Sequence, residues 1–199
     1  IEKRACPKRN TKVCVGCKPC SITTGFAGAG AFSDGKLSLS PDVGGNLPEI
    51  LGYDRTIELL KESDDIYLKF GADEKVYGID EEEEIASIRK KAIQANLKLI
   101  ECPIRHLGTE EGYKIYSRLQ EHLLNEGVDM IFDTMVKDII IEDGVAKGVV
   151  TDKGETYTAD EIVAAVGREG SEWLSGICRK YDIETQVGTV DVGVRVEVR

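Results

Sequence analysis

Three cysteines stand two residues apart near the start of the chain, at Cys14, Cys17 and Cys20, and Cys6 lies a few residues upstream. Two-residue spacing lets thiolates converge on one centre, as in iron–sulfur ferredoxins, although their further cysteine downstream has no counterpart here. Structural zinc more often takes two separated pairs, while a nearby lysine such as Lys18 favours reactive thiolates. The run therefore predicts an iron–sulfur cluster or zinc on these four cysteines, with a redox thiol or an unliganded loop as alternatives.

A stretch of small residues, 25–31, follows the cysteines, and a serine, an aspartate and a lysine come soon after it. Glycines let the backbone approach a flat or phosphorylated ligand closely, and the polar residues would supply contacts. A Gly-x-Gly pair in the stretch is only part of a dinucleotide-binding fingerprint, and no strand–turn–helix unit surrounds it, so a Rossmann interpretation is rejected. A flexible loop is the alternative. The candidate cofactor contacts of this stretch are Gly28, Gly30, Ser33, Asp34 and Gly35.

Arg105 and His106 stand at the end of a predicted strand, 97–104, just before a helix that is predicted to begin at Thr109. A guanidinium can clamp a carboxylate or phosphate with two hydrogen bonds, and a helix start adds backbone donors and a favourable dipole for an anion. Histidine can also transfer a proton near neutral pH. We therefore expect Arg105, His106 and Lys36 to be catalytic residues, with a hydrogen-bonded structural histidine as the alternative.

Hydrophobic periodicity and turn residues predict the elements that position these groups. Helices are expected at 53–70 and 80–97, and a third begins at Thr109 and ends before Gly127 as its C-terminal cap. The run Glu81–Glu84 is more typical of a solvated helix start than of a metal site, because acidic residues stabilise a helix N-terminus. A short helix at 171–181 is also expected, as are strands at 97–104, 128–132, 134–141, 145–151, 155–158, 161–166 and 187–198.

Composition restricts the class of protein. The chain has 199 residues, of which 41% are hydrophobic and 31% charged, as in soluble globular proteins. Its net charge of −10 disfavours nucleic acid and anionic membranes as partners. The sequence has no apolar run long enough to span a bilayer and no secretory signal, and its cysteines are clustered rather than scattered. We therefore expect a cytoplasmic protein with a small-molecule substrate.

A turn at Asp143-Gly144 between two apolar runs, and a later apolar run that ends at Gly167, resemble the second FAD-contacting stretch of two-dinucleotide-fold flavoproteins. Other segments occur with them in a specific order. The whole set is similar to the family of uncharacterised bacterial FAD-dependent dehydrogenases, and it extends over essentially the whole chain. The segments are Cys6-Pro7, the triple-cysteine run, 25–37, 103–109, 164–168 and 191–197.

The resemblance implies an FAD-dependent oxidoreductase with a mixed α/β fold, a β-meander and an inserted substrate region. In that family a Gly-x-Gly-x-x-Gly unit that binds the FAD pyrophosphate comes first; it is absent from this sequence, so we expect a fragment that is inactive alone. By analogy, Val136 would contact the adenine through its backbone, and Gly167 and Arg168 would pass beside the cofactor. A non-catalytic metal-binding module is the alternative. The implied regions are 1–45 (flavin-proximal loops), 46–108 (inserted substrate region), 109–170 (FAD-binding portion) and 171–199 (start of the substrate domain).

Overall fold

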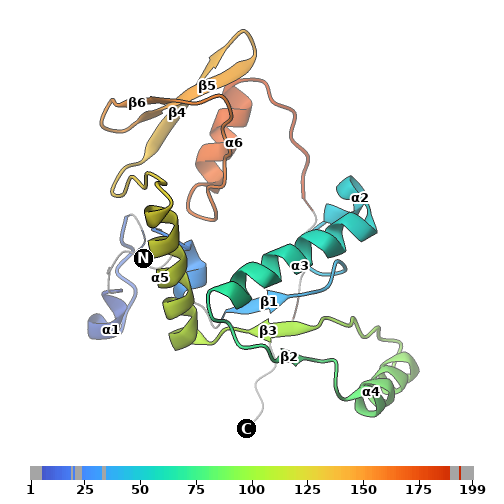
Figure 1. The fold of residues 1–199 in the computed structure, drawn as a ribbon. Helices are drawn as coiled ribbons and strands as arrows, with labels where there is room; N and C mark the ends of the chain where they lie inside the picture. The colour runs from blue at the N-terminus through green and yellow to red at the C-terminus, as the bar shows by residue number, and fades with distance from the viewer. Residues whose placement is uncertain (1–5, 19, 21–23, 33–34, 189–192, 194–199) are drawn as a thin grey trace. The chain divides into compact units, whose positions relative to one another are not determined.

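The computed structural model describes residues 6–18, 20, 24–32, 35–188 and 193 of the chain. The chain forms two compact units, Ile1–Phe132 and Asp133–Arg199. Each unit combines one or more helices with a small antiparallel sheet (Figure 1), so the predicted mixed α/β fold class is confirmed. The boundary between the units falls inside the region 109–170 that the resemblance groups together.

The sheet of the first unit has three antiparallel strands in the order β1-β3-β2 (Figure 1). Successive side chains of a strand point to opposite faces, so the register divides the side chains into two sets. Lys36, directly opposite His106, shares one face with Tyr77, while Arg105 lies on the other face. The strands are β1 (Lys36–Ser38), β2 (Val76–Tyr77) and β3 (Ile104–His106).

Three of the helices in the first unit lie close to their predicted bounds. The last of them ends before Gly127, which takes the predicted left-handed cap conformation at φ 82°. Shorter helical turns not predicted from the sequence accompany them. Within the described residues, every helix is too short or too polar to span a lipid bilayer. The helical elements are α1 (Lys8–Thr11), the 3₁₀ helix η1 (Gly28–Phe32), α2 (Leu47–Leu51), α3 (Tyr53–Lys69), α4 (Glu82–Gln94) and α5 (Thr109–Asn125).

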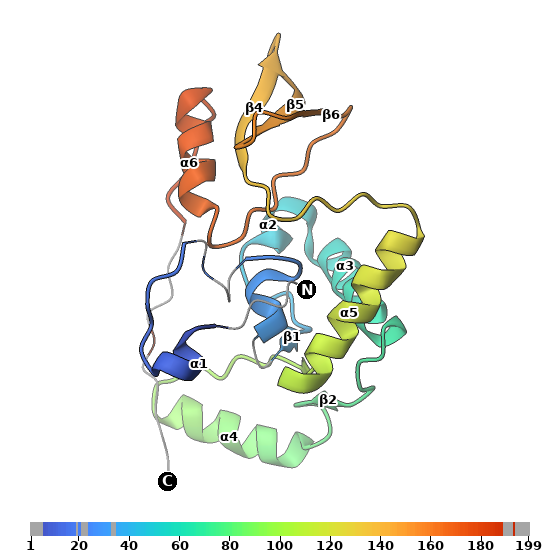
Figure 2. The same ribbon diagram turned by 90° about the vertical axis from the view of Figure 1, so that its left-hand side faces the viewer.

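Aromatic contacts join α3 to α5, which lie beside each other in Figure 1 and Figure 2. The rings of Tyr67 and Tyr116 meet edge to face with centroids 6.0 Å apart, and Phe70 lies 5.2 Å from the ring of His122. Ile115 of α5 is buried, with 1% of its surface exposed. These contacts pack α3 against α5 in the first unit.

The described residues of the second unit form a three-stranded meander and one helix. Its first turn has Asp143 and Gly144 both at positive φ, which is the hairpin turn that the sequence predicted. The indole nitrogen of Trp173 donates to the carbonyl of Lys137 at 2.9 Å, and the Tyr181 hydroxyl donates to the carbonyl of Ile139 at 2.7 Å. The helix is therefore fixed to the first strand. The elements are β4 (Val136–Glu142), β5 (Val145–Thr151), β6 (Thr156–Thr158) and α6 (Ser171–Lys180).

Three predicted strands are wrong in whole or in part. In the predicted strand 97–104, only Ile104 is in a strand, as the first residue of β3. The predicted strand 128–132 is irregular, because the amide of Val128 donates to the carbonyl of Leu123 and completes the C-terminal cap of α5. The segment 161–166 is not a strand, because the described residues provide no partner for it: the backbone groups of 160–165 make no hydrogen bond to any of them. The predicted strand 187–198 lies largely outside the described residues.

Candidate functional site

Two predicted catalytic residues, Lys36 and His106, lie together on one face of the β1-β3-β2 sheet. They are direct cross-strand partners, and such side chains are near neighbours. The ring of Tyr77 meets the imidazole of His106 edge to face, with centroids 6.5 Å apart. The ammonium of Lys75 lies 4.5 Å from the centroid of the Tyr77 ring. We call Lys36, Lys75, Tyr77 and His106 the basic sheet face.

The position of Lys36 is fixed by the glycine before it. Gly35 has φ +62°, a conformation that favours glycine, and its carbonyl accepts a 2.6 Å hydrogen bond from the amide of Leu107. A Cβ at Gly35 would lie 2.9 Å from Cβ of Leu107, which is itself buried. The predicted cofactor contact Gly35 therefore brings β1 against β3, and this sets Lys36 opposite His106.

Arg105 does not have the role that the sequence predicted. Its guanidinium donates two hydrogen bonds to the carboxylate of Asp64 in α3, at 2.5 and 2.7 Å, and a third to the carbonyl of Asp73, at 2.5 Å. Only 4% of the Arg105 surface is exposed. The hydrogen bonds that Arg105 donates to Asp64 are the main reason that the pKa of Arg105 is raised. Arg105 is thus a buried side chain that links β3 to α3, and it is not accessible to a substrate anion.

Asp64 is the residue that sequence reasoning missed. It lies one turn of helix from Leu60 and one turn from Tyr67, on the side of α3 that also carries the buried Thr56. An acidic residue on the inward side of an amphipathic helix signals a buried partner, since an unpaired charge there is costly. That signal indicates a partner but does not identify it as Arg105.

The glycine-rich stretch packs against helix α5. Gly28 and Gly30 belong to η1, and a Cβ at Gly30 would lie 3.1 Å from the hydroxyl oxygen of Tyr116 in α5. That hydroxyl lies 3.3 Å from the hydroxyl of Tyr67, and its burial is the main reason that the pKa of Tyr116 is raised well above its ordinary value. The close approach that the glycines permit is therefore made to α5. The predicted contacts Ser33 and Asp34 lie outside the described residues.

The described part of the cysteine run is not arranged as a metal site. Cys6, Cys14, Cys17 and Cys20 form no disulfide with described residues, and Cys14 is exposed. Among the residues that the structure describes, no group of three or more histidine, cysteine, aspartate or glutamate side chains is placed to hold a metal ion. The structure therefore does not support the predicted cluster or zinc site.

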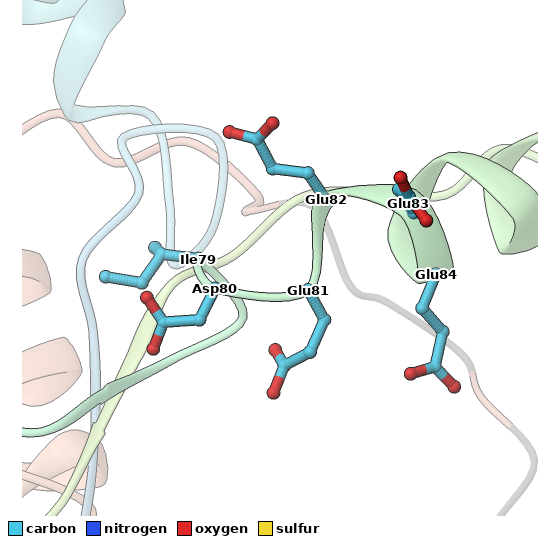
Figure 3. A pocket seen from close by; sticks show the side chains of 6 residues that line it. All are labelled: Ile79, Asp80, Glu81, Glu82, Glu83 and Glu84. Carbon is cyan, nitrogen blue, oxygen red and sulfur yellow. The ribbon is translucent and has the colours of Figure 1, made fainter.

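The acidic run at the start of α4 is a solvated helix start, as the sequence indicated. The helix begins at Glu82, so Glu82–Glu84 occupy its first turn. Together with Ile79, Asp80 and Glu81 they line an open surface hollow of about 600 Å³. Figure 3 shows that the carboxylates of Glu82 and Glu84 point away from each other.

Two of the predicted FAD contacts in the second unit lie where an apolar segment turns into α6. Gly167 has φ +61°, and a Cβ built on it would meet nothing within 4 Å. Arg168 is exposed, and its carbonyl accepts a 3.0 Å hydrogen bond from the hydroxyl of Ser171. The third, Val136, is half-buried at the start of β4, opposite Thr151. The open space beside Gly167 suits the close passage of a flat or phosphorylated group.

Comparison with known proteins identifies the family. A family model described as pyridine nucleotide-disulphide oxidoreductase matches residues 83–198, more than half of the chain. The chain belongs to this family. The match includes almost all of α4, the whole of β3 and α5, and every described element of the second unit, so it contains His106 of the basic sheet face and the Gly167 turn. The protein is accordingly an oxidoreductase of a family that generally binds FAD or NAD(P). No curated protein matches the oxidoreductase.

Proposed function

We propose that this oxidoreductase is FAD-dependent and acts as a dehydrogenase on a small-molecule substrate. The family match over 83–198 is the observation that carries the proposal. It is supported by the meander and by the Gly167 turn, which the sequence resemblance associates with FAD. FAD, when bound, supplies the capacity to accept hydride or electrons, and the protein supplies binding and orientation.

The second unit offers the residues that would hold the cofactor. Gly167 has no neighbouring atom where a side chain would be, so its backbone can lie directly against a bound group. The cation of Arg168 is exposed beside it and suits a phosphate. Val136 follows by analogy with the family. Gly28 and Gly30 serve this function indirectly, by letting η1 pack on Tyr116.

The first unit offers the residues that would face the substrate. The imidazole of His106 is half-buried at the end of β3, where it can give or take a proton. Lys36 is exposed directly opposite and can hold an anionic group of the substrate. Arg105 acts on the other face of the sheet by holding β3 against α3.

Titration of FAD with the protein, followed by flavin fluorescence, tests the proposal. The sequence has no Gly-x-Gly-x-x-Gly turn for the pyrophosphate, so we expect saturable binding with Kd weaker than about 1 μM, equivalent to about −8 kcal/mol. Gly167→Val should abolish it, because a β-branched residue is strained at positive φ. Gly154→Val is the matched control, since Gly154 has φ +81° in the β5–β6 turn and lies outside the predicted contacts.

Three results would overturn the proposal. The first is a lack of saturable FAD binding by the wild-type protein, and the second is equal loss of binding in the Gly154→Val control. The third is tighter binding of NADPH than of FAD, which would assign the site to the other cofactor of the family.

A further inference from the structure

The basic sheet face carries two lysines and no acidic strand residue. The strand residues on this face are Lys36, Ser38, Tyr77, Ile104 and His106, and none of them is acidic. Among the residues described, neither Lys36 nor the adjoining Lys75 forms an ion pair. In a chain with a net charge of −10, such a group of basic side chains is an attractive site for an anion.

On the opposite face of the same sheet, the cation of Arg105 is paired with a carboxylate. There Arg105 is buried and bound by both carboxylate oxygens of Asp64. No carboxylate of a described residue pairs with the two lysines of the basic sheet face, and Lys36 is exposed to solvent. An anionic ligand would supply what Asp64 supplies on the other side.

Beside the lysines, two rings on this face form a surface on which a flat group can pack. The rings of Tyr77 and His106 stand at 88° to each other, so they form a corner against which a flat ring can pack by face and by edge. Lys36 and Tyr77 lie on the two outer strands of the sheet and are offset by two residues along the strands, so the diagonal between them is about 12 Å. Their long side chains can both reach a one-ring or two-ring acid placed within that span.

We propose that the basic sheet face binds a planar aromatic carboxylate, with the carboxylate at Lys36 and His106 and the ring against Tyr77. This assignment rests on the proposed function, because it names the substrate class of the proposed oxidoreductase. It also explains why the register places a lysine directly opposite the histidine. The carboxylate would complete the charge of Lys36 while the imidazole remains in contact with the substrate.

Binding of benzoate is the test, observed by NMR of histidine side chains in protein labelled with ¹⁵N-histidine. The chain has two histidines, so His122 in α5 is an internal reference, and His106→Gln assigns the signals. Titration at constant ionic strength should shift the His106 imidazole signals saturably and leave those of His122 unchanged. Acetate and benzyl alcohol, which lack the ring or the charge, should each bind at least about tenfold more weakly.

Variants separate a built site from general attraction to a positive surface. Lys36→Gln and Tyr77→Leu should each weaken benzoate binding about tenfold. The matched control is Lys69→Gln, because Lys69 lies over the ring of Phe70 at 5.5 Å but outside the basic sheet face. It should bind benzoate as the wild type does, and circular dichroism should show all three variants folded.

The inference is overturned if His106 and His122 shift alike, if acetate binds as well as benzoate, or if Lys69→Gln is as harmful as Lys36→Gln. The flavin titration is independent of this experiment. Benzoate binding without FAD binding would contradict only the proposed function, whereas FAD binding without benzoate binding would contradict only the substrate class.

Discussion

Replacing Asp64 by asparagine should destabilise the first unit, because it leaves the guanidinium of Arg105 without its carboxylate. The side chains of Arg105 and Asp64 are 5% and 13% exposed, so water cannot readily replace the lost partner. Removing one member of a buried pair costs about 3–5 kcal/mol. We expect about 3 kcal/mol, at the lower end, because the carbonyl of Asp73 still accepts a hydrogen bond and Asp64 keeps some contact with solvent.

Urea unfolding followed by circular dichroism at 222 nm measures this loss, because α3, α4 and α5 all belong to the first unit. With a slope of about 2 kcal/mol per molar urea, a loss of about 3 kcal/mol lowers the midpoint by about 1.5 M. The single tryptophan, Trp173, belongs to the second unit. Its fluorescence should therefore report an unchanged midpoint in the same samples.

An exposed ion pair provides the control for Asp64→Asn. Glu58 accepts from Arg55 at 2.8 Å, but the two side chains are 62% and 51% exposed, and such pairs contribute little to stability. Glu58→Gln should leave the midpoint unchanged. If Asp64→Asn lowers the midpoint no more than Glu58→Gln, the Arg105–Asp64 pair does not stabilise the first unit by linking β3 to α3. Replacing both partners by apolar residues, as Asp64→Leu with Arg105→Met, should recover much of the loss.

Further substitutions test the packing of η1, the middle of α6 and the last residue of α6. Gly30→Ala should destabilise by about 1 kcal/mol in urea unfolding, because the new Cβ would crowd the Tyr116 hydroxyl at 3.1 Å; no loss would refute this packing. Gly176→Ala should stabilise by about 0.5–1 kcal/mol, because it is a mid-helix glycine with open space around its Cβ; a loss of stability would contradict that. Lys180 chiefly lowers the pKa of Asp138, so this carboxylate stabilises the fold above its ordinary pKa of about 3.9 and loses that effect as pH falls through the folded pKa. Lys180→Met should therefore move the acid-unfolding midpoint, followed by tryptophan fluorescence, to higher pH, whereas an unchanged midpoint would exclude this coupling.

The helices and the meander were predictable because their signals are local. The apolar residues of α3 recur at helical spacing, and the acidic first turn of α4 follows from the helix dipole. The Asp143-Gly144 turn fixes the β4–β5 hairpin from two residues. Each of these patterns lies within one element, so no knowledge of distant contacts was needed.

The role of Arg105 was not predictable, because it depends on Asp64, 41 residues earlier in the chain. The side chain that determines the role lies in another element, and the strand 104–106 points Arg105 and His106 to opposite faces of the sheet. Because Arg105 and His106 are adjacent in the sequence, we expected them in a single site, but the strand register puts them on opposite faces of the sheet. Gly30 shows the same limitation, since the sequence signals close approach without identifying Tyr116 as the group that comes near.

The segment 160–165 has a consequence for handling the protein. Its backbone groups make no hydrogen bond to the described residues, and 87% of the surface of Val163 is exposed. An open stretch of chain with unpaired backbone groups is a template on which identical chains can add strand by strand. We therefore expect concentration-dependent aggregation to begin at its apolar part, 162–165, with Asp160 and Glu161 before it and Arg168 after it acting as charged gatekeepers.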